Sequence, residues 1–156
     1  DRVVIEALRG RAAVANARLA YQLFVEKFSG ERWERLAAKG ARVQRPLWAS
    51  TSTKNPAYRD VMYVEELIGP HTVNTMPPAT IEAFRDHGIV ARTVDTGVND
   101  AHALFEALAS IGVDMTDVTD KLLRDGLASF QKSLDALIAD LESKTRQLGH
   151  ELATTR

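Results

Sequence analysis

The spacing of apolar residues predicts that the chain begins with helices. Over residues 1–28 apolar side chains recur every three or four positions, the period of a helix with one buried face, and Gly10 is a candidate break. Asn16 lies in this apolar setting, where we expect a local hydrogen bond. A second helix, capped by Ser29, is expected to end near Gly40. The predicted buried face of the first helix consists of Ala13, Ala17, Ala20, Phe24 and Phe28.

The middle of the chain alternates between strand and helix patterns. Residues 47–49 form a short apolar run between Pro46 and a cluster of hydroxyl residues, which predicts a buried strand. A helix is expected over residues 59–67, a second strand over 71–76 and another helix from the following prolines to about residue 87. Strands and helices that alternate at this spacing favour a parallel arrangement of βα units.

The last third of the chain is predicted to be helical. Asn99 is expected to cap a helix that ends near Ile111, and Thr116 is expected to cap the next one. The strongest apolar pattern of the chain follows, at steps of four and three, and we call it the leucine seam. Two interpretations remain open, because the seam can pack against the chain's own core or bind a partner helix. The leucine seam consists of Leu123, Leu127, Phe130, Leu134, Leu137, Leu141 and Leu148.

Composition narrows the class of protein. The 156 residues are 45% hydrophobic, so we expect one domain with a real core over residues 1–156. A formal net charge of −1 gives no electrostatic reason to expect nucleic acid or membrane as a partner. The absence of cysteine excludes disulfides and thiolate zinc sites and fits a cytoplasmic location. No metal site is expected, since the histidines show no ligand spacing: His71, His87, His102 and His150.

Candidate chemistry lies just after the first predicted strand. Four hydroxyl residues, 50–53, precede Lys54, and Asn55-Pro56 then stops regular structure. A lysine and several hydroxyls past the carboxyl end of a strand suit an oxyanion, most simply a phosphate, because the ammonium supplies charge and the hydroxyls and loop amides supply donors. The alternative is an ordinary solvated loop between a strand and a helix.

Two motifs in this region resemble bacterial transaldolases. Arg45-Pro-Leu-Trp-Ala-Ser-Thr-Ser-Thr-Lys-Asn-Pro-Ala-Tyr58 is similar to the segment around that family's seventh barrel strand, and residues 63–77 resemble its eighth strand and the preceding turn. Residues 86–88 and 126–130 also fall where the family has similar runs. The family fold is a (β/α)₈ barrel, so the resemblance implies a C-terminal fragment of a TIM barrel. We expect a helix-rich α/β chain with about two parallel strands and a long C-terminal helix.

The resemblance also implies a function. Transaldolases transfer a dihydroxyacetone unit between sugar phosphates in the pentose phosphate pathway, through a Schiff base and without a cofactor. The substrates expected from the family are of the fructose 6-phosphate, sedoheptulose 7-phosphate and erythrose 4-phosphate class. The family's Schiff-base lysine lies on an earlier strand in an apolar run, which this sequence lacks. We therefore expect no catalytic residue here and an inactive isolated chain, with the missing N-terminal half or a further copy as its partner.

Four residues carry the site prediction. Ser52 and Lys54 correspond to the family's Ser-x-Arg/Lys after the seventh strand, which implies phosphate binding, whereas Thr53 replaces the aromatic of many relatives. Asn74 and Thr75 end the second predicted strand, and we expect them either near the substrate or hydrogen-bonded to neighbouring loops. A function of a different class remains open, namely a non-catalytic helical interaction module that uses the leucine seam.

Overall fold

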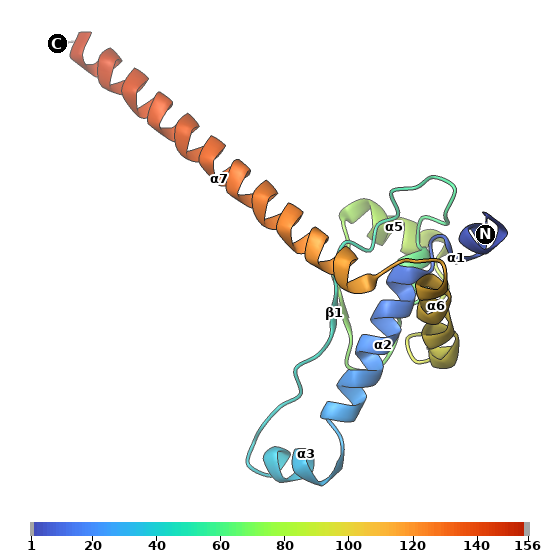
Figure 1. Ribbon diagram of the computed structural model, residues 1–156. Helices are drawn as coiled ribbons and strands as arrows, with labels where there is room; N and C mark the ends of the chain where they lie inside the picture. The colour runs from blue at the N-terminus through green and yellow to red at the C-terminus, as the bar shows by residue number, and fades with distance from the viewer. Residues whose placement is uncertain (1, 155–156) are drawn as a thin grey trace. The chain divides into compact units, whose positions relative to one another are not determined.

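The computed structural model describes the backbone of residues 2–154 and the side chains of residues 5–148. The chain divides into two units, Asp1–Ile111 and Gly112–Arg156, and each is described by itself. Figure 1 shows the order of the elements along the chain. The first unit contains α1 (Arg2–Leu8), α2 (Ala12–Lys27), α3 (Gly30–Ala37), β1 (Leu47–Trp48), α4 (Met62–Glu65), β2 (Val73–Asn74), α5 (Pro78–His87) and α6 (Val98–Ser110).

The predicted break at Gly10 separates α1 from α2. Gly10 has a φ of +75°, a conformation that residues with a side chain rarely adopt. A Cβ at this position would lie 2.8 Å from the ring of Tyr58, which is closer than any real contact. Glycine is thus required here both for the chain reversal and for the close approach of the loop that follows β1.

The buried face of α2 differs from the predicted one. Val14, Ala15 and Tyr21 are buried, whereas Ala13 and Ala20 are exposed. The prediction was wrong for these two alanines because α2 packs on two sides at once. Its Val14 and Tyr21 contact the core around β1, and its Ala15 contacts α6. The small side chains between these two contacts border open space instead of a neighbouring helix.

Two short parallel strands form the sheet of the described residues. Leu47 pairs with Val73 and Trp48 with Asn74, and backbone N–H groups of Val73 and Thr75 donate to Pro46 O and Trp48 O, both at 2.9 Å. The βαβ connection is as predicted, but both strands are shorter than expected. Of the first predicted strand only Trp48 is buried, and Leu47 is 53% exposed.

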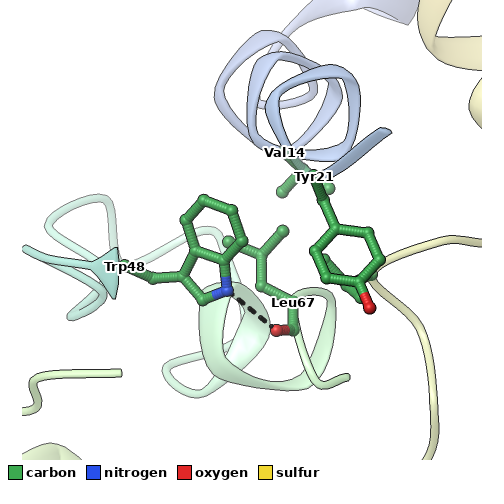
Figure 2. Packing of buried hydrophobic residues seen from close by; sticks show 5 residues of the cluster. Val14, Tyr21, Trp48 and Leu67 are labelled. Atoms are coloured by element: carbon green, nitrogen blue, oxygen red, sulfur yellow. Dashed lines mark hydrogen bonds between the residues drawn. The ribbon is translucent and has the colours of Figure 1, made fainter. Parts of the chain in front are cut away.

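The core of the first unit lies between α2 and β1. In Figure 2, Trp48 and Leu67 face Val14 and Tyr21 of α2. The indole Nε1 of Trp48 donates a hydrogen bond to Leu67 O at 3.1 Å, so the one polar atom of this buried ring is satisfied. Val94 completes the cluster and is fully buried. Sequence-distant segments meet in this core and hold β1 in place.

The ends of the later helices also differ from the predicted caps. Helix α6 follows Gly97, which has a φ of +64°, so Asn99 lies inside the helix and does not cap it. Its Ala101 and Leu104 pack against Ala15 of α2. Thr116 is not the cap of the last helix either, because a carboxylate oxygen of Asp114 accepts the backbone N–H of Thr116 at 2.7 Å. A carboxylate at a helix start also suits the positive end of the helix dipole.

The second unit consists of α7 (Met115–Thr154), a single helix of 40 residues that continues through Gly126. The long C-terminal helix is as predicted. All residues of the leucine seam are exposed, from 50% at Leu134 to 81% at Phe130. These values describe α7 by itself, and both interpretations of the seam, packing against the chain's own core or binding a partner helix, stay predictions. Across the described residues, no helix has both the length and the apolar character needed to cross a membrane.

Candidate functional site

A cavity of about 600 Å³ lies between α2 and the loop that follows β1. One wall is the face of α2 that carries Ala13, Asn16, Ala17 and Ala20, and the other is residues 47–55. Tyr58, Tyr63 and Leu67 complete the lining. The sequence predicts that these alanines pack against a neighbouring helix. In the structure they leave room for a small molecule beside the hydroxyl-rich loop.

Ser52 and Lys54 are brought together at this cavity. The ammonium Nζ of Lys54 donates a hydrogen bond to Ser52 Oγ at 2.7 Å. Because the ammonium is the donor, the hydroxyl hydrogen of Ser52 remains free to point at a further acceptor. Lys54 is exposed, and none of the ion pairs among the described side chains includes it. The pair offers a positive charge and a hydroxyl donor to an anion in the cavity.

The other hydroxyls of the loop fix its conformation. Thr51 is buried, and its Oγ1 donates to Asn74 Oδ1 at 2.8 Å. The hydroxyl of Thr53 lies 2.9 Å from Arg59 O and 3.0 Å from Asp60 O and is shared between these two carbonyls. Ser50 adopts a φ of 58°, in the left-handed region, and turns the chain away from β1. Thr51 and Thr53 therefore anchor the loop that carries Ser52 and Lys54.

Asn74 and Thr75 lie beside the loop but do not line the cavity. Asn74 accepts the hydrogen bond from Thr51, and Thr75 donates to Trp48 O from its backbone N–H at 2.9 Å and from its hydroxyl at 3.3 Å. These contacts are the hydrogen bonds to neighbouring loops that the sequence allows as an alternative. A direct contact of Asn74 or Thr75 with substrate stays a prediction.

Outside residues 47–55, the lining has three polar residues that were not predicted as site residues: Asn16, Tyr58 and Tyr63. Asn16 is exposed at the cavity, where its neighbours on α2 are alanines. A signal was present, since Asn16 shares one helical face with three alanines, and a face without bulk leaves its polar member accessible. Tyr58 and Tyr63 line the cavity because of the way the segment after β1 folds, and no local sequence pattern indicates this fold.

A cluster of ionic groups lies behind the loop. Arg59 contacts both carboxylate oxygens of Glu65, at 2.8 and 2.9 Å, and the ring of His87 lies between Asp60 at 2.9 Å and Asp86 at 3.1 Å. The hydrogen bond to Asp60, followed by that to Asp86, raises the pKa of His87 above its ordinary value. The same contact with His87 lowers the pKa of Asp60, and the hydrogen bond from Arg59 lowers the pKa of Glu65.

Among the side chains that the structure describes, no group of three or more histidine, aspartate or glutamate residues is arranged to hold a metal ion. Asp60 and Asp86 are instead spanned by an imidazole, which is a hydrogen-bonded arrangement. The prediction for His150 lies outside the residues whose side chains are described.

Comparison with known proteins places the chain in a family. The family model described as Transaldolase/Fructose-6-phosphate aldolase matches residues 1–141, so the chain belongs to this family. It is 54% identical over 145 residues to Transaldolase of Parafrankia sp. (strain EAN1pec), a match that covers 92% of this chain and 38% of that protein. Transaldolase 2 of Nostoc punctiforme (strain ATCC 29133 / PCC 73102) is 50% identical over 146 residues, with the same coverage.

A third relative gives the same result. Transaldolase of Mycobacterium bovis (strain BCG / Pasteur 1173P2) is 51% identical over 135 residues, which are 85% of this chain and 36% of that protein. The family predicted from the two motifs is thus confirmed. The chain spans less than two fifths of the length of these relatives, so the activity of a complete transaldolase is a matter for the proposal that follows.

Proposed function

We propose that this chain is the C-terminal part of a transaldolase and that Ser52 and Lys54 bind the phosphate of its sugar phosphate substrate. The observation that carries the proposal is the Lys54–Ser52 pair at the cavity, immediately after β1. The complete enzyme would transfer a dihydroxyacetone unit between sugar phosphates through a Schiff base, in the pentose phosphate pathway of the cytoplasm. Fructose 6-phosphate, sedoheptulose 7-phosphate and erythrose 4-phosphate are the substrates that the family suggests.

The cavity supports this assignment on physical grounds. An ammonium and a free hydroxyl hydrogen side by side are donors that a phosphate accepts well, and charge-assisted hydrogen bonds are stronger than neutral ones. The alanine face of α2 leaves space for the body of a sugar, and Asn16 adds an amide that can donate and accept. In (β/α)₈ barrels the loops after the last strands often hold phosphate, which fits a loop that follows β1.

Lys54 is proposed as a binding residue and not as the nucleophile. A Schiff-base lysine must be neutral to attack a carbonyl, and this requires a dry or cationic setting that lowers its pKa. Lys54 is exposed and sits among hydroxyl groups. We therefore propose that the nucleophile and the other catalytic groups belong to a part of the enzyme outside residues 1–156, and that these residues alone form a partial barrel domain without transaldolase activity.

Binding measurements on the 156-residue chain test the proposal. We expect Lys54→Ala to raise the Kd for fructose 6-phosphate roughly ten- to a hundredfold, because a charge-assisted hydrogen bond contributes about 1.5–3 kcal/mol. Lys54→Arg should keep most of the affinity, and binding of unphosphorylated fructose should be unaffected. Lys121→Ala is the matched control, since Lys121 is paired with Asp125 on α7.

Borohydride trapping adds an independent test of the role of Lys54. With fructose 6-phosphate, we expect no covalent adduct on the isolated chain. An adduct on Lys54, or a Lys54→Ala variant with unchanged affinity for the phosphorylated sugar, would show that the phosphate assignment is wrong.

A second candidate function rests on the exposed leucine seam. The seam is interrupted only at Lys144, and Asp120 occupies the position one step before its first residue, Leu123. If two copies of α7 pair antiparallel about Lys132, Leu123 lies opposite Leu141 and Leu127 opposite Leu137. The same register places Asp120 opposite Lys144 at both ends of the pair. The seam thus fits a second copy of itself both in apolar contact and in charge.

Sedimentation of charge variants tests this pairing. We expect a concentration-dependent dimer that Lys144→Asp weakens, because it sets two carboxylates against each other at each end. The double variant Asp120→Lys/Lys144→Asp should restore the dimer, since the charges are exchanged in place. A chain that remains monomeric at all concentrations would contradict the pairing and indicate that another part of a transaldolase covers the seam.

A further inference from the structure

We propose that His87 and Asp60 form a positioning device for the phosphate loop, in which the charge on His87 holds the loop in its binding conformation. The inference rests on the proposed phosphate role of Ser52 and Lys54. It assigns a function to three residues that the proposed chemistry does not use, namely Thr53, Asp60 and His87.

The first link joins the loop to residues 59 and 60. Thr53 stands between Ser52 and Lys54, and its hydroxyl is shared between Arg59 O at 2.9 Å and Asp60 O at 3.0 Å. Because the backbone of Thr53 connects the two binding residues, fixing its side chain limits the positions of both. The link is a directional hydrogen bond, so it depends on where residues 59 and 60 are held.

The second link joins residues 59 and 60 to the end of α5. His87 Nε2 lies 2.9 Å from Asp60 Oδ1, and the guanidinium Nη2 of Arg59 donates to the backbone oxygen of His87 at 2.7 Å. Glu65 holds the same guanidinium from the other side and accepts the backbone N–H of Ile89 at 2.9 Å. Both carbonyls that receive Thr53 therefore belong to residues anchored at the carboxyl end of α5.

The charge of His87 decides whether its ring can hydrogen-bond to both aspartates. An imidazolium donates from both ring nitrogens and can serve Asp60 and Asp86 together, whereas a neutral imidazole has a single N–H and can serve one of them. The charged groups facing the ring are the carboxylates of Asp60, Asp86 and Glu65 and the guanidinium of Arg59. Together these groups raise the pKa of His87 and favour its protonated ring. The hydrogen bonds from His87 to Asp60 and Asp86 therefore both persist to a higher pH than they would for an isolated histidine.

A titration without ligand tests the coupling alone. In ¹⁵N-labelled chain, we expect the amide signals of Thr53 and Lys54 to move between about pH 5.5 and pH 8.5 with the same apparent pKa as the ring of His87. The movement should vanish in His87→Gln. His102→Gln is the matched control, because His102 contacts Gln22 and lies in α6. Amide signals that titrate unchanged in His87→Gln, or that do not titrate in the unaltered chain, would overturn the proposal.

An anion-binding measurement then tests the consequence for the site. Sulfate is a suitable probe because its charge is constant over this pH range. At about pH 6 we expect Asp60→Asn and His87→Gln to weaken sulfate binding roughly three- to tenfold, the effect of one lost hydrogen bond, with a smaller difference at about pH 8.5. Equal losses at both pH values would indicate a merely structural role of His87 and contradict the charge dependence.

The failures of the two proposals can be told apart. If Lys54→Ala leaves sulfate binding intact while the ligand-free titration behaves as expected, the phosphate role is wrong and the positioning device stands. Where Asp60→Asn fails to fold, Thr53→Val and Thr53→Ser give the same test from the loop side. The valine variant removes the shared hydrogen bond and should abolish the pH-dependent movement at Lys54, whereas the serine variant keeps the hydroxyl and should retain it.

Discussion

The two units of the chain differ in the burial of their apolar side chains. In the first unit, Trp48 and Val94 are buried among residues from four separate segments, and the polar atom of Trp48 is satisfied within the core. In α7, Leu134 and Phe130 remain exposed although their spacing is more regular than any in the first unit. Regular spacing is enough to predict a helix, whereas the core of the first unit also depends on contacts between segments that are distant in the sequence. The predictions below use this contrast, from the largest expected effect to the smallest.

Trp48→Ala should give the largest loss of stability. Removing a buried tryptophan from a packed core costs about 3–5 kcal/mol, a large share of the stability of a small domain. Urea unfolding followed by circular dichroism measures the change. Trp33→Ala is the matched control, because Trp33 is half-buried in α3 and its aromatic contact is one edge-on pair with Phe28. Similar losses in the two variants would show that the core around β1 does not dominate the stability of the first unit.

Alanine substitutions at two glycines should act with opposite sign in the two units. A Cβ at Gly69 would lie 2.2 Å from Cγ1 of the fully buried Val94, so Gly69→Ala should destabilise the first unit by about 1–3 kcal/mol. At Gly126 no atom lies within 4 Å of an added Cβ, and the position is inside α7. Gly126→Ala should therefore stabilise the helix by about 0.5–1 kcal/mol, as thermal unfolding of each variant can show.

Leu134→Ala should have little effect on the dilute chain. Leu134 is 50% exposed, and substitutions at exposed positions usually change stability by less than about 0.5 kcal/mol. Asp135→Ala serves as the neighbouring control, since it removes one hydrogen bond from Gln131 along the helix. Thermal melts at low and high protein concentration separate the cases. A loss of several kcal/mol for Leu134→Ala in dilute solution would mean that the seam is covered within a single chain.

The smallest expected effect is a pH dependence of the stability of the first unit. The pKa of His87 is raised in the folded state. The stability that His87 contributes is therefore complete below the ordinary pKa of 6.5 and is lost as the pH rises through the folded pKa. The folded pKa of Asp60 is lowered, so its contribution is present above the ordinary value of 3.8 and is lost as the pH falls through the folded value. The melting temperature should decline slightly above neutral pH in the unaltered chain. It should decline less in His87→Gln.

Local signals in the sequence predicted most of the elements. The break at Gly10, the two strands near residues 47 and 73 and the long last helix follow from apolar spacing and from glycine and proline positions. The sequence also predicted Ser52 and Lys54 as phosphate-binding residues, because both belong to one short loop whose composition indicates an oxyanion, and that role stays a prediction. These features depend on neighbours in the sequence, and a single sequence contains that information.

The remaining features depend on contacts between distant residues. Asn16 and Tyr58 share a cavity because α2 meets a loop some forty positions away, and His87 reaches Asp60 across a separation of 27 residues. The exposure of Leu47 likewise depends on which distant segments cover its face of β1. No periodicity in the sequence encodes contacts between distant residues. The sequence therefore indicated the hydroxyl-rich loop after β1 as a candidate site, but not the groups that surround and support that loop.

The hydrogen-bonded indole of Trp48 has an optical consequence. This ring lies in the cavity wall as well as in the core, and its Nε1 is engaged by the carbonyl of Leu67. Tryptophan emission shifts in wavelength when the polarity around the ring changes. The sequence contains one other tryptophan, Trp33, so a chain with Trp33 replaced by phenylalanine carries a single fluorophore. The fluorescence of Trp48 in this variant would report, in a single sample, both the filling of the cavity and the separation of β1 from β2.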